Sequence, residues 1–119
     1  MNAKWWIGSY IEVFEPEKAS EIESELHVNE NFMLIAAVNF EEAHRNLLIY
    51  SEPSHALSAW KGVEGHWRVI GISCLLPIYE SLEDGSELLW KRLVGYTRAD
   101  LADLVYTKEE LLSQVALQD

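Results

Sequence analysis

Glu41 and His44 are three residues apart, the Glu-x-x-His spacing found in half of a carboxylate-bridged di-iron site. Such a site needs a second motif and two further glutamates on neighbouring helices, whereas this sequence indicates only one long helix. We therefore expect Glu41 and His44 to lie on the exposed face of an amphipathic helix. None of the four histidines forms a His-x-x-x-His pair, so the sequence predicts no metal site: His27, His44, His55 and His66.

The candidate nucleophiles also lack the neighbours that would activate them. The one cysteine, Cys74, lies in the apolar run Ile72 to Leu76, which is typical of a small buried hydrophobe. The serines around His55 stand in a proline-containing segment, where such residues usually cap turns. Gly62-Val63-Glu64-Gly65 matches a phosphate-clamping loop in letters only, because Glu64 lies inside it. We expect no catalytic residues and no cofactor.

The charge of the chain excludes two classes of partner and favours a third. Nine Lys plus Arg stand against twenty Asp plus Glu, a net charge of −11. This charge repels phosphate backbones and anionic lipids, so we expect no nucleic-acid partner and no membrane partner, whereas a basic protein is attracted. The run from Glu12 to Glu30 holds seven glutamates and one lysine, and Glu21, Glu23 and Glu25 are its candidate partner-binding residues. The alternative is that this run is a solvated loop that only maintains solubility.

Length and hydropathy indicate a small domain without a membrane segment. A chain of 119 residues can bury a core without metal or disulfides. Its longest charge-free apolar stretch, Val69 to Tyr79, is well short of the roughly 20 residues that a membrane helix needs. No export signal is visible near Trp5, because Gly8, Ser9 and Glu12 interrupt the apolar run, so we expect a cytoplasmic protein.

The first half of the chain reads as two strands followed by a helix. Residues Lys4 to Phe14 are rich in aromatic and β-branched side chains, and Phe32 to Asn39 form a second apolar run. Asn39 is a good helix N-cap, with Glu42 three residues later. The helix that follows should end before Pro53.

The second half predicts two further strands and short helices. A long strand is expected from about His66 to Tyr79, at an edge of the sheet or bulged near Pro77. Asp84-Gly85 is a strong hairpin-turn signal, so Ser86 to Val94 is predicted to return beside that strand. Thr97 and Thr107 each precede an acidic residue by three, which predicts helix starts, the second opening a helix from Lys108 to about Ala116.

These elements predict an α+β fold: an antiparallel sheet of about four strands in the order β-β-α-β-β, one main helix packed on it and short C-terminal helices. We expect a domain over residues 1–94 and a helical extension over 95–119 that packs on it. Apolar residues occur on both faces of the sheet, so the second face needs the extension or another subunit to cover it, and we expect a homodimer. Core packing is the favoured interpretation for most of the tryptophans, and Trp60 and Trp90 are the candidate interface anchors.

Four segments resemble the small bacterial family catalogued as domain of unknown function 4288. They are Trp5-Trp6, Ala37 to Ala43, Trp67 to Ile72 and Leu82 to Leu88, in that order, within a resemblance that extends from about Lys4 to Leu93. The resemblance implies a compact α+β domain, no established activity and no functional residues to transfer.

Three hypotheses for the function follow. The first is a small acidic, non-catalytic binding module that neutralises a basic protein, as immunity proteins do for nuclease toxins. The second is a structural component of a homo-oligomer. The third is a small enzyme that uses dispersed Glu and His residues. We favour the first two, because no constellation of residues supports catalysis.

Overall fold

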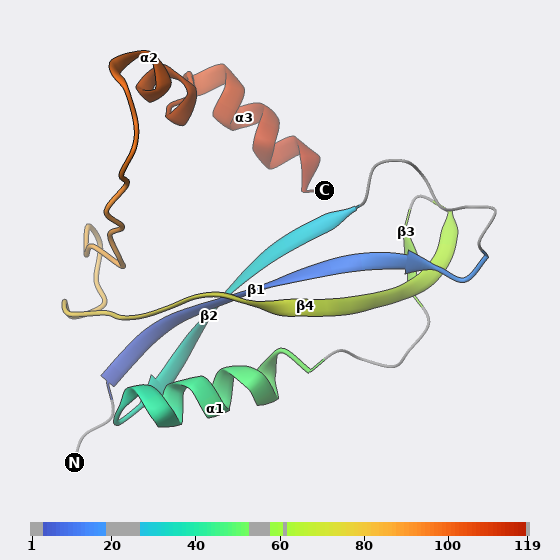
Figure 1. The fold of residues 1–119 in the computed structure, drawn as a ribbon, viewed down its shortest axis with the longest axis horizontal. Helices are drawn as coiled ribbons and strands as arrows, with labels where there is room; N and C mark the ends of the chain where they lie inside the picture. The colour runs from blue at the N-terminus through green and yellow to red at the C-terminus, as the bar shows by residue number, and fades with distance from the viewer. Residues whose placement is uncertain (1–3, 19–26, 53–57, 61, 119) are drawn as a thin grey trace. The chain divides into compact units, whose positions relative to one another are not determined.

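The computed structural model describes residues 4–18, 27–52, 58–60 and 62–118 (Figure 1). The side chains of Ser58 and Trp60 lie outside this description. The chain divides into two units, residues 1–89 and 90–119, each described by itself below. The sequence predicted the boundary a few residues later, at 94/95, and the packing of the extension on the domain stays a prediction.

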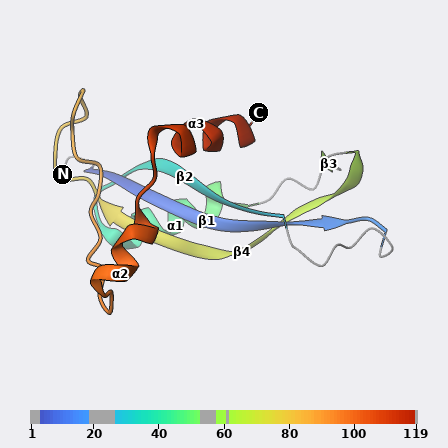
Figure 2. The ribbon, with the colours of Figure 1, turned by 90° about the horizontal axis from the view of Figure 1, so that it is seen from above.

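Residues 1–89 form an antiparallel sheet with one helix on one face (Figures 1 and 2). Its strands are β1 (Lys4–Pro16), β2 (Val28–Ala37), β3 (Ser58–Trp60) and β4 (Val63–Pro77), and their order in the sheet is β2-β1-β4-β3. The strand β1 is one of the two long inner strands, and its aromatic and β-branched side chains suit a pleated, half-buried surface. The predicted α+β class with an antiparallel sheet is confirmed.

Among the described residues of this unit, the one long helix is α1, which spans Phe40–Tyr50. It begins where expected, because the Asn39 Oδ1 accepts a hydrogen bond from the Glu42 backbone N–H at 2.9 Å. It ends before Pro53, with the Ser51 hydroxyl donating to the carbonyl oxygen of Leu48 at 3.2 Å. Both helix boundaries therefore follow from local capping chemistry.

The core lies between α1 and one face of the sheet. Pairing of β1 with β2 places alternate residues on this face, where Trp6, Ile35 and Ala37 pack against Ala43 and Leu47 of the helix. The Trp6 indole N–H is satisfied there by the carbonyl oxygen of Ala37 at 3.1 Å. Burial of this cluster fixes α1 on the sheet.

Glycine at position 8 allows the helix to approach β1 closely. A Cβ atom at Gly8 would lie 2.8 Å from the Ile35 Cδ1 and 2.8 Å from a methyl group of Leu47. Because both neighbours are fully buried, a side chain at this position would push α1 away from the sheet.

The predicted returning strand over Ser86 to Val94 is wrong. Residues 86–94 contain no strand, and the fourth strand of the sheet is β3, which pairs with the first three residues of β4. The particular four-strand arrangement that we predicted is therefore not confirmed. The Asp84-Gly85 turn itself exists: Gly85 has φ +86°, and the Ser86 N–H donates to the Glu83 carbonyl oxygen at 3.0 Å.

The segment after β4 forms no strand, and a few of its apolar side chains lie against the sheet. Ile78 is buried, and its N–H continues the ladder by donating to the Trp5 carbonyl oxygen at 2.8 Å. Leu88 and Leu89 then lie beside Ile7 of β1. Pro77 is at an open edge, as predicted, since β3 pairs only with residues 63–65 of β4.

Residues 90–119 contain short helices and no buried side chain among those described, 90–118. The helices are α2 (Arg98–Leu101), followed by a 3₁₀ turn (Ala102–Leu104), and α3 (Lys108–Leu117). Capping boxes open α2 and α3, formed by Thr97 with Asp100 and by Thr107 with Glu110. The two predicted helix starts and the short C-terminal helices are confirmed.

Candidate functional site

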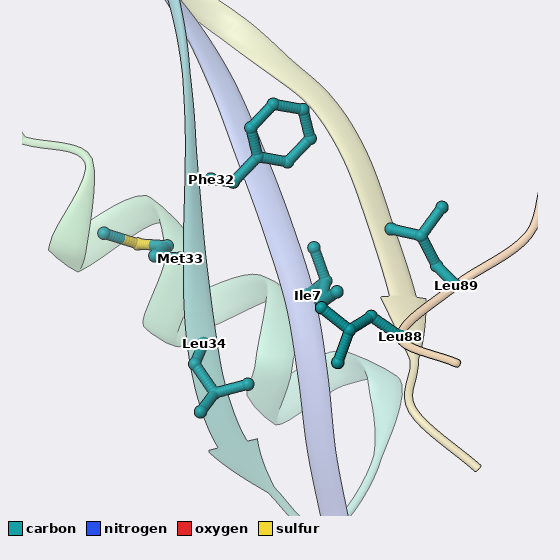
Figure 3. A pocket seen from close by; sticks show the side chains of 6 residues that line it. All are labelled: Ile7, Phe32, Met33, Leu34, Leu88 and Leu89. Carbon is teal, nitrogen blue, oxygen red and sulfur yellow. The ribbon is translucent and has the colours of Figure 1, made fainter. Parts of the chain in front are cut away.

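Residues 1–89 carry an apolar groove on the sheet, with a volume of about 410 Å³ (Figure 3). We call it the sheet groove. It is lined by one residue of β1, three of β2 and two of the segment after the Asp84-Gly85 turn: Ile7, Phe32, Met33, Leu34, Leu88 and Leu89.

Strand register creates the groove. Ile7 pairs with Leu34, and Phe32 is two residues from Leu34 on the same strand, so these three side chains share the face opposite α1. Met33 projects to the other face and packs against the core cluster. Leu88 closes the groove on the β1 side, where Figure 3 shows its side chain beside Ile7.

The floor of the groove is buried and its walls are open to solvent. Ile7 is only 8% exposed, whereas Phe32 is 57%, Leu34 47% and Leu88 50% exposed. All six lining residues are apolar, so the groove offers no proton donor or nucleophile. Its chemistry is the removal of apolar groups from water, at about 25 cal/mol per Å² of surface buried.

Ionisable side chains gather instead near the end of β1. The His66 Nδ1 lies 2.7 Å from the Glu17 Oε1, and the Arg68 Nη2 lies 2.8 Å from the Glu15 Oε1. The register of β1 and β4 brings these side chains together, because it sets Glu15 opposite His66. All four side chains are well exposed, so these pairs contribute little stability.

These two pairs could not be predicted from the sequence. Each joins residues about fifty positions apart, and only the register of two distant strands brings them together. The signal in the sequence is limited to acidic residues at the end of one predicted strand and basic residues near the start of another.

The predicted partner-binding residues are distributed as follows. Glu21, Glu23 and Glu25 lie outside the described residues. Trp60 has its backbone in β3, and its side chain also lies outside the description. Trp90 belongs to the unit 90–119 and is 59% exposed.

The environments of Cys74, Glu41 and His44 show packing and exposure rather than a catalytic or metal-binding arrangement. Cys74 is buried, as expected for a small hydrophobe. Glu41 is exposed on α1, while His44 is partly buried and stacks on Phe40 with ring centroids 6.0 Å apart. No group of three His, Cys, Asp or Glu side chains that could hold a metal ion occurs within the described ranges. A second Glu-x-x-His sequence, residues 52–55, falls partly outside them.

Across the described helices, none combines the length and the apolar character needed to cross a membrane.

An α+β domain with an apolar sheet groove is thus the class that the described residues define. The model of one family, described as Domain of unknown function (DUF4288), matches residues 5–90. The chain belongs to this family, as the resemblance of its four segments indicated. The matched range covers β1 to β4, α1 and the segment that carries Leu88 and Leu89. No curated protein and no solved structure matches the chain.

Proposed function

We propose that this protein is a small, non-catalytic protein-binding module whose sheet groove holds apolar side chains of a basic partner. The observation that carries the proposal is the lining of the groove, which is apolar throughout and exposed at Phe32, Leu34 and Leu88. Contiguous exposed apolar surface on a soluble protein typically marks an interaction site.

The lining favours a protein segment over a small metabolite. Small-molecule sites combine apolar walls with a few polar groups that fix the orientation of the ligand. The sheet groove has six apolar lining residues and none of these polar groups. Aliphatic or aromatic side chains of a partner match such a lining.

Charge supplies the preference for a basic partner. The net charge of −11 raises the rate at which a cationic protein is captured, and salt screens this attraction over about 8–10 Å. We propose Glu21, Glu23 and Glu25 as the steering residues and Trp60 and Trp90 as further contacts. The proposal retains the immunity-like role and the cytoplasmic location expected from the sequence.

Peptide binding tests the groove. We expect the full chain to bind a fluorescent peptide of alternating lysine and leucine more tightly than its glutamate and leucine counterpart. Phe32→Ser should weaken binding roughly tenfold or more, since burial of a large apolar side chain contributes about 1.5–3 kcal/mol. Ile70→Ser is the matched control, because Ile70 is 56% exposed on β4 and does not line the groove. Equal affinity for the two peptides, or equal losses in the two variants, would overturn the proposal.

Charge reversal tests the steering residues separately. Changing Glu21, Glu23 and Glu25 together to lysine should leave folding intact and slow association with the lysine peptide several-fold at low salt. An unchanged association rate would identify the acidic run as a solvated loop and would leave the groove as the sole recognition element.

A further inference from the structure

The strand β2 has one edge without a partner in the described sheet. It is the first strand in the order β2-β1-β4-β3, so only its inner edge is paired. The Phe14 N–H donates to the His27 carbonyl oxygen at 3.0 Å, and residues 13 and 28 are the next pair along the ladder. Because bonding alternates along an antiparallel pair, the odd-numbered residues of β2 bond to β1, and the even-numbered ones direct their N–H and C=O groups outward. The outward set is Val28, Glu30, Phe32, Leu34 and Ala36.

Proteins normally protect such edges, and the contrast with β4 shows how. The open edge of β4, beyond residues 63–65, carries Arg68 and Pro77, and the extra residues Ile70 and Ser73 produce two register shifts against β1. Positive charge, proline and bulges are devices that prevent edge-to-edge pairing.

None of these devices is present on β2. Its ten residues include no lysine, arginine or proline, and its pairing with β1 runs without a shift from Lys4 with Ala37 to Val13 with Val28. Glu30 is its only charged residue. A long, regular and nearly uncharged edge of this kind is suited to accept another strand.

We propose that β2 pairs antiparallel with β2 of a second copy of this chain, so that the two sheets form one continuous sheet about a two-fold axis. Outward-facing residues then lie opposite outward-facing residues. With Phe32 opposite Leu34 of the second copy, Glu30 lies opposite Ala36, and the two Glu30 carboxylates are separated. Phe32 and Leu34 of both copies come together on the groove face, so the two sheet grooves become one continuous apolar channel.

Charge selects a second copy over a basic peptide as the occupant of this edge. A cationic strand beside β2 would have only one carboxylate to pair with, that of Glu30. The β2 strand of a second copy is equally uncharged, so its residues match those of the first β2 along the edge. The net charge of −11 on each copy opposes association, and physiological salt screens this repulsion beyond about 8 Å. Dimer formation should therefore strengthen as salt is raised, opposite to the binding of the lysine peptide.

The mass of the full chain in solution tests the pairing. Light scattering at about 100 µM and physiological salt should give twice 13.7 kDa. Leu34→Pro removes an outward N–H and should give the monomer, whereas Leu34→Ala keeps that N–H and should leave a weaker dimer. Protected amides at Met33 and Ile35, which face β1, would show that the proline variant is folded.

Hydrogen exchange of the unmodified protein gives an independent answer if the proline variant does not fold. The Phe32 and Leu34 amides should exchange slowly at high concentration and quickly on dilution, while those of Met33 and Ile35 stay slow. A monomer with fast exchange at Phe32 and Leu34 would overturn the proposal. A monomer whose outward amides become protected only with the lysine peptide would assign the edge to a partner strand and would also overturn it.

Discussion

Residues 1–89 and residues 90–119 obtain their structure in different ways. In the first unit, strands far apart in sequence pair and bury a core that includes Trp6, Ile35 and Leu47. In the second, two capping boxes define α2 and α3, and every described side chain is exposed. Capping satisfies backbone groups at a helix end but removes no apolar surface from water, so isolated helices this short are marginal. Stability and the candidate site therefore both depend on the first unit.

The largest expected loss of stability distinguishes a core leucine of the first unit from an exposed leucine of the second. Leu47 of α1 is completely buried against the sheet, whereas Leu112 on α3 is 68% exposed. Leu47→Ala should lower the free energy of unfolding by about 2–5 kcal/mol through lost burial and a cavity. Leu112→Ala should change it by less than about 0.5 kcal/mol. Chemical denaturation followed by circular dichroism measures both, and equal losses would show that α3 buries its apolar side in solution.

Alanine substitutions at two glycines test how closely α1 packs on the sheet. Gly8→Ala should cost roughly 1–3 kcal/mol, because the new methyl group meets the buried Ile35 and Leu47 side chains. Gly71→Ala is the control, since nothing lies within 4 Å of the new Cβ atom on β4. Its free energy of unfolding should stay the same or rise slightly. Similar losses in both variants would contradict the close approach of α1 to β1.

Substitutions at Gly85 test the turn that follows β4 in the first unit. Its φ of +86° is strained for a β-branched residue, so Gly85→Val should destabilise the protein by about 1–2 kcal/mol. Space around the position is open, and strain of the backbone is therefore the only expected cause. Gly85→Asn, which tolerates positive φ, should lose less. Equal melting temperatures for the wild type and the valine variant would mean that the turn is absent.

The smallest effect concerns pH in the second unit. Hydrogen bonds from the Thr97 backbone N–H and side chain hold the pKa of Asp100 below its ordinary value of 3.8. Because this pKa is lowered, the ionised Asp100 stabilises the α2 cap at pH values above 3.8. The contribution is lost as the pH falls through the lower pKa that Asp100 has in the folded protein. Amide chemical shifts of residues 98–104 should therefore titrate below pH 3.8, and Asp100→Asn should remove the titration. A titration at or above the ordinary value would contradict the capping box.

Features set by neighbouring residues could be predicted from the sequence. Three helix starts are each fixed by an N-cap residue and the residue three positions later, and the structure contains all three caps. The pairs are Asn39 with Glu42, Thr97 with Asp100 and Thr107 with Glu110. The aromatic and β-branched residues of β1 were likewise sufficient to identify a strand.

Features that depend on pairing between distant segments could not be predicted. Asp84-Gly85 specifies a turn but not what the following residues contact, so Ser86 to Val94 was wrongly predicted as a strand. The sheet groove depends on the register that sets Ile7 opposite Leu34 and on the arrival of Leu88 beside them. No local pattern encodes either relation, which is why the predicted site residues were chosen by charge and by aromatic character.

The most direct test of the binding account is to map where a basic apolar segment contacts the full chain. Nuclear magnetic resonance of the isotope-labelled protein, titrated with the lysine and leucine peptide, reports both units in one experiment. We expect the shifts of Ile7, Phe32, Leu34 and Leu88 to change most, with Ile70 little affected. Shifts confined to residues 108–117 of α3 would contradict the account and would assign recognition to the C-terminal unit.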